Sequence, residues 1–131
     1  MRPLNIRRSI IIVLFACLAG CGADLHVTSI QLGRALNADD TVATHTTTFE
    51  PTDTVYVSIL TAGNGSGTLG VRWTYAGRVM GDPTKKVSYR GAKATEFHLQ
   101  SAGGFPPGEY SVEACLNGQS VESRTFHVNK P

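Results

Sequence analysis

Residues 69–75, Leu-Gly-Val-Arg-Trp-Thr-Tyr, carry the clearest secondary-structure signal in the chain. Apolar side chains alternate here with small or polar ones, so that Leu69, Val71, Trp73 and Tyr75 share one face. Successive side chains of a β-strand point to opposite faces of its sheet, which makes this alternation typical of a strand buried on one side. The segment therefore predicts a central strand whose inner face packs into a core.

The same period of two recurs on both sides of this segment. Upstream, Val55, Val57 and Ile59 alternate with polar residues after a turn at residues 51–53. Downstream, Phe97 alternates with Glu96 and His98. Short strands are also expected at 26–32, 78–80, 85–90 and 95–100, and in a closing hairpin within 105–128.

Turn-forming residues separate these strands. The polar stretch 37–48 predicts an irregular loop with a piece of edge strand, and Asn-Gly-Ser-Gly at 64–67 predicts a tight reversal. An Asn-Gly turn at 117–118 closes the last hairpin. A two-residue turn would put Val121 and Phe126 on opposite faces, so we expect a β-bulge between them.

Seven or eight short antiparallel strands, with no segment showing an apolar stripe of period 3.6, predict an all-β sandwich. Trp73 lies in the middle of its strand, and Tyr110 lies two residues before the inward Val112. In these features residues 26–129 resemble immunoglobulin-like and fibronectin-like domains, with their core tryptophan and tyrosine corner. Val112, and Val57 opposite, stand where antibody domains carry their disulfide. A transthyretin-like sandwich is the alternative.

The first 20 residues are expected to form a cleaved signal peptide. Arg2, Arg7 and Arg8 precede the apolar run 9–20, which has the order of charged, apolar and small residues found in export signals. The run is shorter than the roughly 20 apolar residues that a transmembrane helix needs. A retained N-terminal anchor is the less favoured alternative.

The end of this signal resembles a bacterial lipobox, formed by Leu18, Ala19, Gly20 and Cys21. The resemblance implies cleavage before Cys21, which would then carry the lipid, while Cys17 is discarded with the signal. The alternatives are a plain secreted protein with a free Cys21, or a metal site formed by the two cysteines. The metal site is disfavoured because one cysteine lies inside the apolar run without another ligand nearby.

A lipobox places the protein in the bacterial cell envelope, bound to a bilayer through acylated Cys21. Gly22 follows this cysteine, which resembles the outer-membrane pattern of Gram-negative bacteria, whereas Asp24 is too far along to match the inner-membrane retention signal. In a Gram-positive host the protein would face outward on its one membrane. Residues 21–25 form a tether of roughly 17 Å at about 3.4 Å per residue, which keeps the domain, 26–131, close to the lipid.

Cysteine content and charge narrow the possibilities further. Cys115 is the only cysteine after the lipobox, so no internal disulfide can form. The 12 Lys and Arg residues outnumber the 10 Asp and Glu residues, but the three arginines of the signal account for the excess. The net charge of the domain therefore gives no case for nucleic acid or for an anionic bilayer as a partner.

No cofactor, metal or catalytic site is predicted. The sequence lacks G-x-S-x-G and H-E-x-x-H motifs, and no histidine has a second ligand at metal-binding spacing. His98 and His127 are expected on the outer sheet faces, where they would form a weak metal pair only as cross-strand neighbours. Cys115 is expected on the outer face beside Glu113, as a half-covered thiol or a site of pairing with a partner chain.

The sequence favours a membrane-anchored lipoprotein whose sandwich is a non-catalytic module that binds a membrane-proximal envelope protein. The candidate interaction surface consists of Tyr56, Arg72, Tyr89 and Phe105. The alternative is a lipoprotein that binds a ligand or inhibits a hydrolase through its loops at 41–48 and 102–108.

Overall fold

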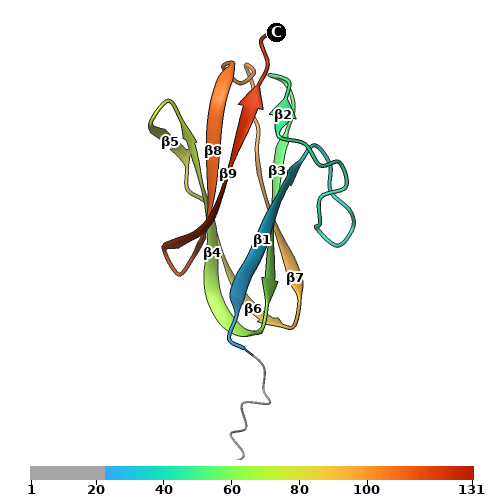
Figure 1. Ribbon diagram of the computed structural model, residues 1–131, viewed down its shortest axis with the longest axis vertical. Helices are drawn as coiled ribbons and strands as arrows, with labels where there is room; N and C mark the ends of the chain where they lie inside the picture. Colours follow the sequence, from blue (N-terminus) through green and yellow to red (C-terminus); the bar gives the residue numbers. More distant parts are fainter. Residues whose placement is uncertain (1–22) are drawn as a thin grey trace, which may run out of the picture.

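The computed structural model describes residues 23–131, which form two β-sheets packed face to face in an elongated sandwich (Figure 1). The predicted signal peptide and the lipobox residues Leu18, Ala19, Gly20 and Cys21 lie outside the described residues and stay predictions. Nine strands and no helix occur within 23–131. They are β1 His26–Gly33, β2 Thr48–Phe49, β3 Val55–Ala62, β4 Asn64–Tyr75, β5 Arg78–Gly81, β6 Thr84–Arg90, β7 Lys93–Leu99, β8 Gly108–Leu116 and β9 Gln119–Val128.

The smaller sheet has the strand order β1-β3-β7, and the larger one has the order β2-β9-β8-β4-β5. β6 also pairs with β4, along its first half, so β5 and β6 occupy successive parts of one edge. All pairs are antiparallel except that between β2 and β9. The predicted all-β sandwich is confirmed.

The core lies between the sheets and contains the residues that the alternation placed inside. Trp73 is 1% exposed, and its ring meets that of Phe126 edge-on at 6.1 Å. Val57 and Val112, at the positions compared with the antibody disulfide, are fully buried on opposite sheets. Full burial of an aliphatic side chain stabilises a fold by about 1.5–3 kcal/mol. At these two positions the sheets are therefore held together by apolar packing and not by a disulfide.

The predicted tyrosine corner is present. The Tyr110 hydroxyl donates a hydrogen bond to the carbonyl oxygen of Pro106, four residues earlier. The Tyr75 ring stacks on the Tyr110 ring at 4.4 Å, and its hydroxyl donates to the carbonyl of Pro107 at 3.0 Å. These two bonds fasten the loop before β8 to the upper end of the larger sheet.

The predicted reversal at 64–67 is wrong, because these residues are the first part of β4, paired with β6. The chain instead passes from β3 to β4 through Gly63, at a φ of 83°. A Cβ at Gly67 would lie 3.1 Å from the Leu116 side chain. Some of these glycines therefore mark close packing against a strand and not a turn.

The C-terminal hairpin turns at residues 117–118 as predicted, and the expected bulge is present near the turn. Cys115 pairs with Ser120 and Ala114 pairs with Glu122, so that Val121 is the extra residue. This shift brings Phe126 to the inner face, where it is buried.

The first described residues are bonded to the sandwich. The Asn64 N–H donates to the carbonyl of Ala23, and the Leu25 N–H donates to the carbonyl of Asn64, both at 3.0 Å. Leu25 is also buried. Three of the five residues assigned to a tether are thus held against β4, at the lower end in Figure 1, opposite the C-terminus.

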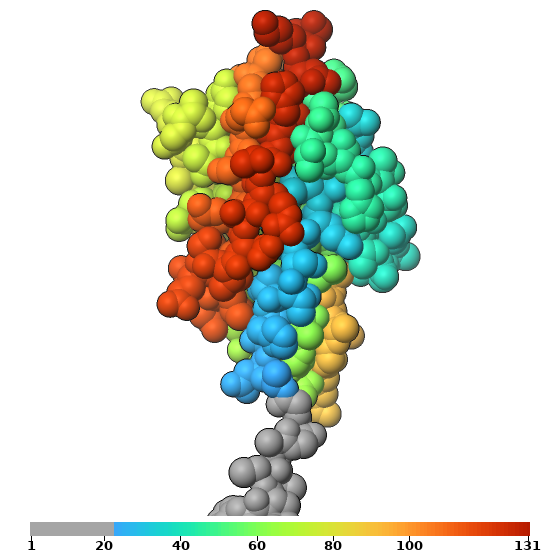
Figure 2. Space-filling view, viewed as in Figure 1, coloured from blue at the N-terminus to red at the C-terminus, as the bar shows by residue number. Residues whose placement is uncertain are grey.

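The loop between β1 and β2 folds onto the outer face of the smaller sheet. Val42 is buried, and its N–H donates to the Gln31 side chain of β1 at 3.0 Å. Ser58 faces outward from β3 with Tyr56 and Leu60, yet it is fully buried. In Figure 2 this loop, in cyan and teal, forms a bulge on one flank of the molecule.

Candidate interaction surfaces

An open groove of about 800 Å³ lies on the outer face of the smaller sheet. All three strands of that sheet contribute to its floor, and the tip of the β1–β2 loop forms one wall. Ligand sites in proteins commonly have volumes of about 300–1,000 Å³. The lining residues are Thr28, Ala38, Asp39, Asp40, Thr41, Leu60, Thr61, Ala62, Ala92, Lys93 and Ala94.

The groove combines a floor of small side chains with charged walls. Asp39 and Asp40 come from the loop, and the exposed Lys93 comes from the start of β7. The Asp39 carboxylate accepts hydrogen bonds from the Thr41 hydroxyl, at 2.6 Å, and from the Thr41 N–H, at 3.1 Å. These bonds lower the pKa of Asp39, so the loop wall remains negative at neutral and mildly acidic pH.

The sequence did not reveal this groove, although one signal for it exists. Residues 92–94 are Ala-Lys-Ala, and Leu60 and Ala62 point outward from the neighbouring strand. Because the three alanine side chains are short, the surface of the sheet is depressed here. Which part of the loop covers that surface depends on the Val42 contact, and no local pattern predicts it.

The predicted interaction surface is wrong, because the structure separates its four members. Tyr56 lies on the smaller sheet, where its ring meets that of His98 at 5.8 Å. Arg72 lies on the larger sheet, 3.8 Å from the Glu113 carboxylate. These two residues share no face.

The other two members are largely inside. Phe105 is only 2% exposed, because its ring packs edge-on against Tyr110 and its N–H donates to the carbonyl of Pro51. Tyr89 is half-buried against the core, and its hydroxyl hydrogen-bonds that of Thr95 at 2.8 Å. Phe105 in its loop and Tyr89 in its edge strand therefore cover the core and do not form a surface for a partner.

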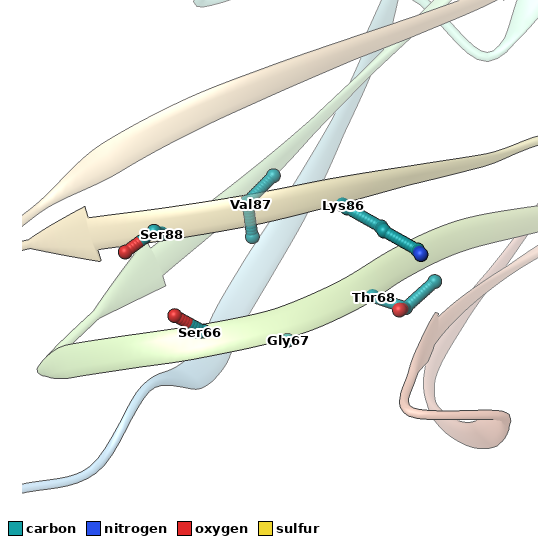
Figure 3. Close-up of a pocket in the computed structure, with 6 residues that line it drawn as sticks. All are labelled: Ser66, Gly67, Thr68, Lys86, Val87 and Ser88. Carbon is teal, nitrogen blue, oxygen red and sulfur yellow. The ribbon is translucent and has the colours of Figure 1, made fainter.

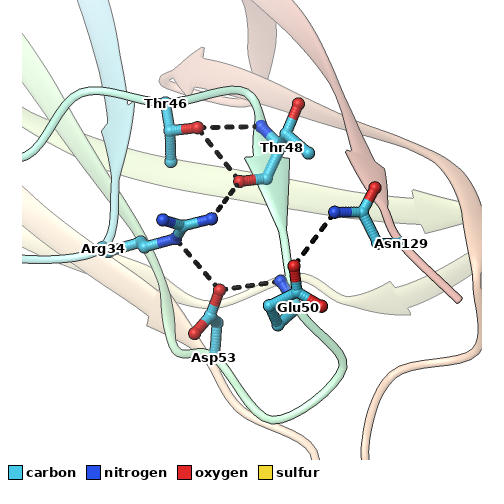
Figure 4. Close-up of polar contacts among 6 residues, drawn as sticks. All are labelled: Arg34, Thr46, Thr48, Glu50, Asp53 and Asn129. Atoms are coloured by element: carbon cyan, nitrogen blue, oxygen red, sulfur yellow. Dashed lines mark hydrogen bonds and ion pairs between the residues drawn. The ribbon is translucent and has the colours of Figure 1, made fainter. Parts of the chain in front are cut away.

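The loops at the upper end form a connected polar network (Figure 4). Arg34 donates to the Asp53 carboxylate at 3.1 Å and to the carbonyl of Thr48 at 2.9 Å. The Glu50 N–H donates to the same carboxylate at 2.7 Å, and the Asn129 amide donates to the Glu50 side chain at 3.0 Å. The network ties β2 to its neighbouring loops, although each exposed ion pair contributes less than about 1 kcal/mol.

The histidines do not assemble a metal site. His98 and His127 are exposed as predicted, but they lie on different sheets and are not cross-strand neighbours. Each has its own carboxylate partner, Glu96 and Glu109 respectively. No cluster of three or more His, Cys, Asp or Glu side chains suited to a metal ion occurs in 23–131.

Cys115 lies on the outer face of its strand, as predicted, but it is only 8% exposed, so the expected half-exposed thiol is wrong. It pairs with Gly70 in the middle of the larger sheet, and the longer side chains of Arg72, Glu113 and Asp82 lie close enough to act on its charge. Burial is the main cause that raises the pKa of the thiol. The short side chain is sheltered by its taller neighbours.

Two smaller features complete the surface. β5 is a short edge strand whose Val79 and Met80 are 56% and 41% exposed. A shallow depression of about 470 Å³ lies along β4 and β6 (Figure 3), with the hydroxyl groups of Ser66, Thr68 and Ser88.

Within 23–131 no helical segment has the length and hydrophobicity needed to cross a bilayer.

Comparison with solved structures identifies the fold. An immunoglobulin-like protein from Pseudomonas aeruginosa superposes with a TM-score of 0.55 at 11% identity, over 82% of this chain and 98% of the other. The fold is an immunoglobulin-like β-sandwich.

Two large enzymes contain a similar sandwich. They are a β-glucosidase involved in saponin metabolism from intestinal bacteria, with a TM-score of 0.53 and 17% identity, and an alkylpurine DNA glycosylase from Pseudomonas fluorescens, with 0.52 and 11%. The matches cover 80% and 83% of this chain but 16% and 31% of those chains. No protein-family model and no curated protein matches the sequence. Identities this low show the fold alone.

Proposed function

We propose that the protein is a membrane-anchored bacterial lipoprotein whose immunoglobulin-like domain is a non-catalytic module for binding another envelope protein. The groove on the outer face of the smaller sheet is the observation that carries this proposal. It would receive an extended segment of the partner, because small side chains on the floor let a second backbone approach closely.

The charges of the groove give the partner segment a direction. The carboxylates of Asp39 and Asp40 favour a basic side chain at the loop wall, and Lys93 favours an acidic one at the β7 side. Leu60 offers an apolar contact between them. An extended segment with one basic, one apolar and one acidic residue matches this arrangement.

Anchoring through Cys21 would keep the groove near the lipid. Thr28, Ala62 and Lys93, which line it, lie on the halves of β1, β3 and β7 nearest to Ala23. A partner at this height would be membrane-embedded or membrane-associated.

Cross-linking mass spectrometry on intact cells tests the proposal. Ala94→Arg places a long side chain on the groove floor, and Ser111→Arg places one at an equally half-buried outward position of the larger sheet. We expect a discrete neighbour that is lost in Ala94→Arg and in Cys21→Ser but retained in Ser111→Arg. Neighbours that are unchanged in Ala94→Arg would contradict the binding site.

A further inference from the structure

The cations of the domain are unevenly distributed. Residues 84–93, which comprise β6, the turn to β7 and the first residue of β7, contain four of them and no acidic residue, although the domain as a whole is close to neutral. The four are Lys85, Lys86, Arg90 and Lys93, and all are exposed. We call residues 84–93 the basic hairpin; the net charge of the domain does not reveal it.

The hairpin lies at the end of the sandwich where the described chain begins (Figure 1). Arg90 pairs with Asn64, whose N–H in turn donates to the carbonyl of Ala23. Only Cys21 and Gly22 separate the lipobox cleavage site from Ala23, a span of at most about 7 Å at 3.3–3.6 Å per residue. Arg90, at the end of β6 that pairs with this segment, would therefore be held near the point of lipid attachment, and interactions between exposed charges extend over a Debye length of about 8–10 Å.

Two of these cations share one flat face with hydroxyl groups. Lys86, Ser88 and Arg90 alternate along β6 and point outward, whereas Val87 between them packs against the core. Their register partners on β4 include Thr68 and Ser66. Figure 3 shows Thr68 beside the Lys86 ammonium group, and Ser66 and Ser88 farther along the two strands, all lining the shallow depression.

The cations on this face have few competing charges. Among the described residues Lys86 and Arg90 form no ion pair, whereas Lys85 is 3.5 Å from the Glu96 carboxylate. Asp24 is the one acidic residue of the adjoining N-terminal segment. The face therefore presents ammonium, guanidinium and hydroxyl donors, the groups that bind phosphate oxygens.

We infer that the outer face of β4 and β6, with the cations Lys86 and Arg90, docks onto the anionic phospholipid headgroups of the bilayer that holds Cys21. The inference rests on the proposed function, because it takes Cys21 as the point of attachment. Docking fixes the orientation of the sandwich on the membrane. Each cation near an anionic surface raises partitioning by about fivefold.

The test uses the exported full chain, purified with its lipid and reconstituted into vesicles of phosphatidylcholine with or without phosphatidylglycerol. A fluorophore is attached at Ala92→Cys, on the basic hairpin, or at Ala102→Cys, an equally exposed alanine at the opposite end. Quenching by headgroup spin labels reports which end lies on the lipid. The buried Cys115 adds little background labelling.

We expect strong quenching of the Ala92→Cys label that requires phosphatidylglycerol and disappears in high salt, and weak quenching of the Ala102→Cys label. Lys86→Glu with Arg90→Glu removes the effect. Arg78→Glu with Lys130→Glu, an equal charge change at exposed sites away from the hairpin, leaves it intact. Equal quenching in both lipid mixtures, or equal loss in both double variants, would overturn the inference.

Intact mass measured beforehand separates this inference from the anchoring itself. If Cys21 carries a lipid but the label near the basic hairpin is not preferentially quenched, the inference is wrong and the proposed anchoring is retained. If no lipid is found, the anchor fails, and vesicle flotation of the same exported protein decides the inference. Binding that requires phosphatidylglycerol and falls about 25-fold or more in Lys86→Glu/Arg90→Glu supports it, whereas the absence of such binding overturns it.

Discussion

Tyr110 shows how one hydroxyl group fixes a loop at the residue scale. Its ring is buried between Tyr75 and Phe126, and its hydroxyl holds the carbonyl of Pro106. Tyr75 makes the equivalent bond to Pro107 at a more exposed position. Removing the hydroxyl group from each tyrosine in turn therefore compares the loss of the same hydrogen bond at a buried and at a more exposed position.

We predict that Tyr110→Phe lowers the free energy of unfolding by about 1–2 kcal/mol, because it leaves a carbonyl without its partner. Tyr75→Phe should cost about half of this or less, since water can replace the lost bond. Urea denaturation of both variants measures the difference. Equal losses would mean that burial of the Tyr110 hydroxyl adds nothing.

The second prediction at this scale concerns the reactivity and titration of the Cys115 thiol. Because burial raises the pKa of its thiol, labelling by a maleimide should be slow in the folded protein and fast in urea. The unfolded chain releases the thiol proton first as the pH rises, so the contribution of this group to stability is present below about pH 9 and is lost above it. The variant Cys115→Ala should show a weaker alkaline decline in the free energy of unfolding, and an unchanged decline would contradict the prediction.

At the scale of elements, the passage from β3 to β4 links the two sheets to the N-terminal segment. Gly63 has a φ of 83°, and a Cβ there would lie 2.3 Å from the Asp24 carbonyl oxygen. Gly77, in the turn between β4 and β5, has a φ of 77° with no atom within 4 Å of its Cβ position. A residue with a Cβ would be similarly strained at either φ, but it would meet different surroundings at the two positions.

We therefore predict that Gly77→Ala costs about 1 kcal/mol, the price of a left-handed alanine. Gly63→Ala should cost about 2–4 kcal/mol, since the clash with Asp24 adds to the same strain. It should also increase amide exchange at Leu25, whose N–H bonds to Asn64. Equal costs, with no change at Leu25, would show that the N-terminal segment is not held at Gly63.

The strands themselves were predictable to the extent that one face of each is buried. Leu69, Val71 and Trp73 alternate because β4 has a core side and a solvent side, and this pattern alone placed them correctly. The turn predicted at 64–67 is wrong because a glycine permits either a turn or close packing, and only the neighbouring strand decides between them. The inward Phe105 was missed for a similar reason, since its contacts come from distant parts of the chain.

At the scale of the whole molecule, the sandwich has two different ends (Figure 1). One end carries the start of the described chain and the basic hairpin, and the other carries the C-terminus and the polar network around Arg34. The groove lies on the half nearer the first of these. The groove was not predictable from net charge or periodicity, because it depends on which strands become neighbours. The cations at 84–93 are visible in the sequence, but their position beside the N-terminal segment depends on the pairing of β6 with β4.

A photoreactive amino acid in place of Leu60, on the groove floor, tests the central claim most directly. Thr125, an exposed residue of the larger sheet, is the control position. Illumination of intact cells should yield one discrete adduct from position 60 and none from position 125, and Cys21→Ser should abolish it. The absence of an adduct from position 60, or the same adducts from both positions, would contradict a membrane-held module that binds its partner in the groove.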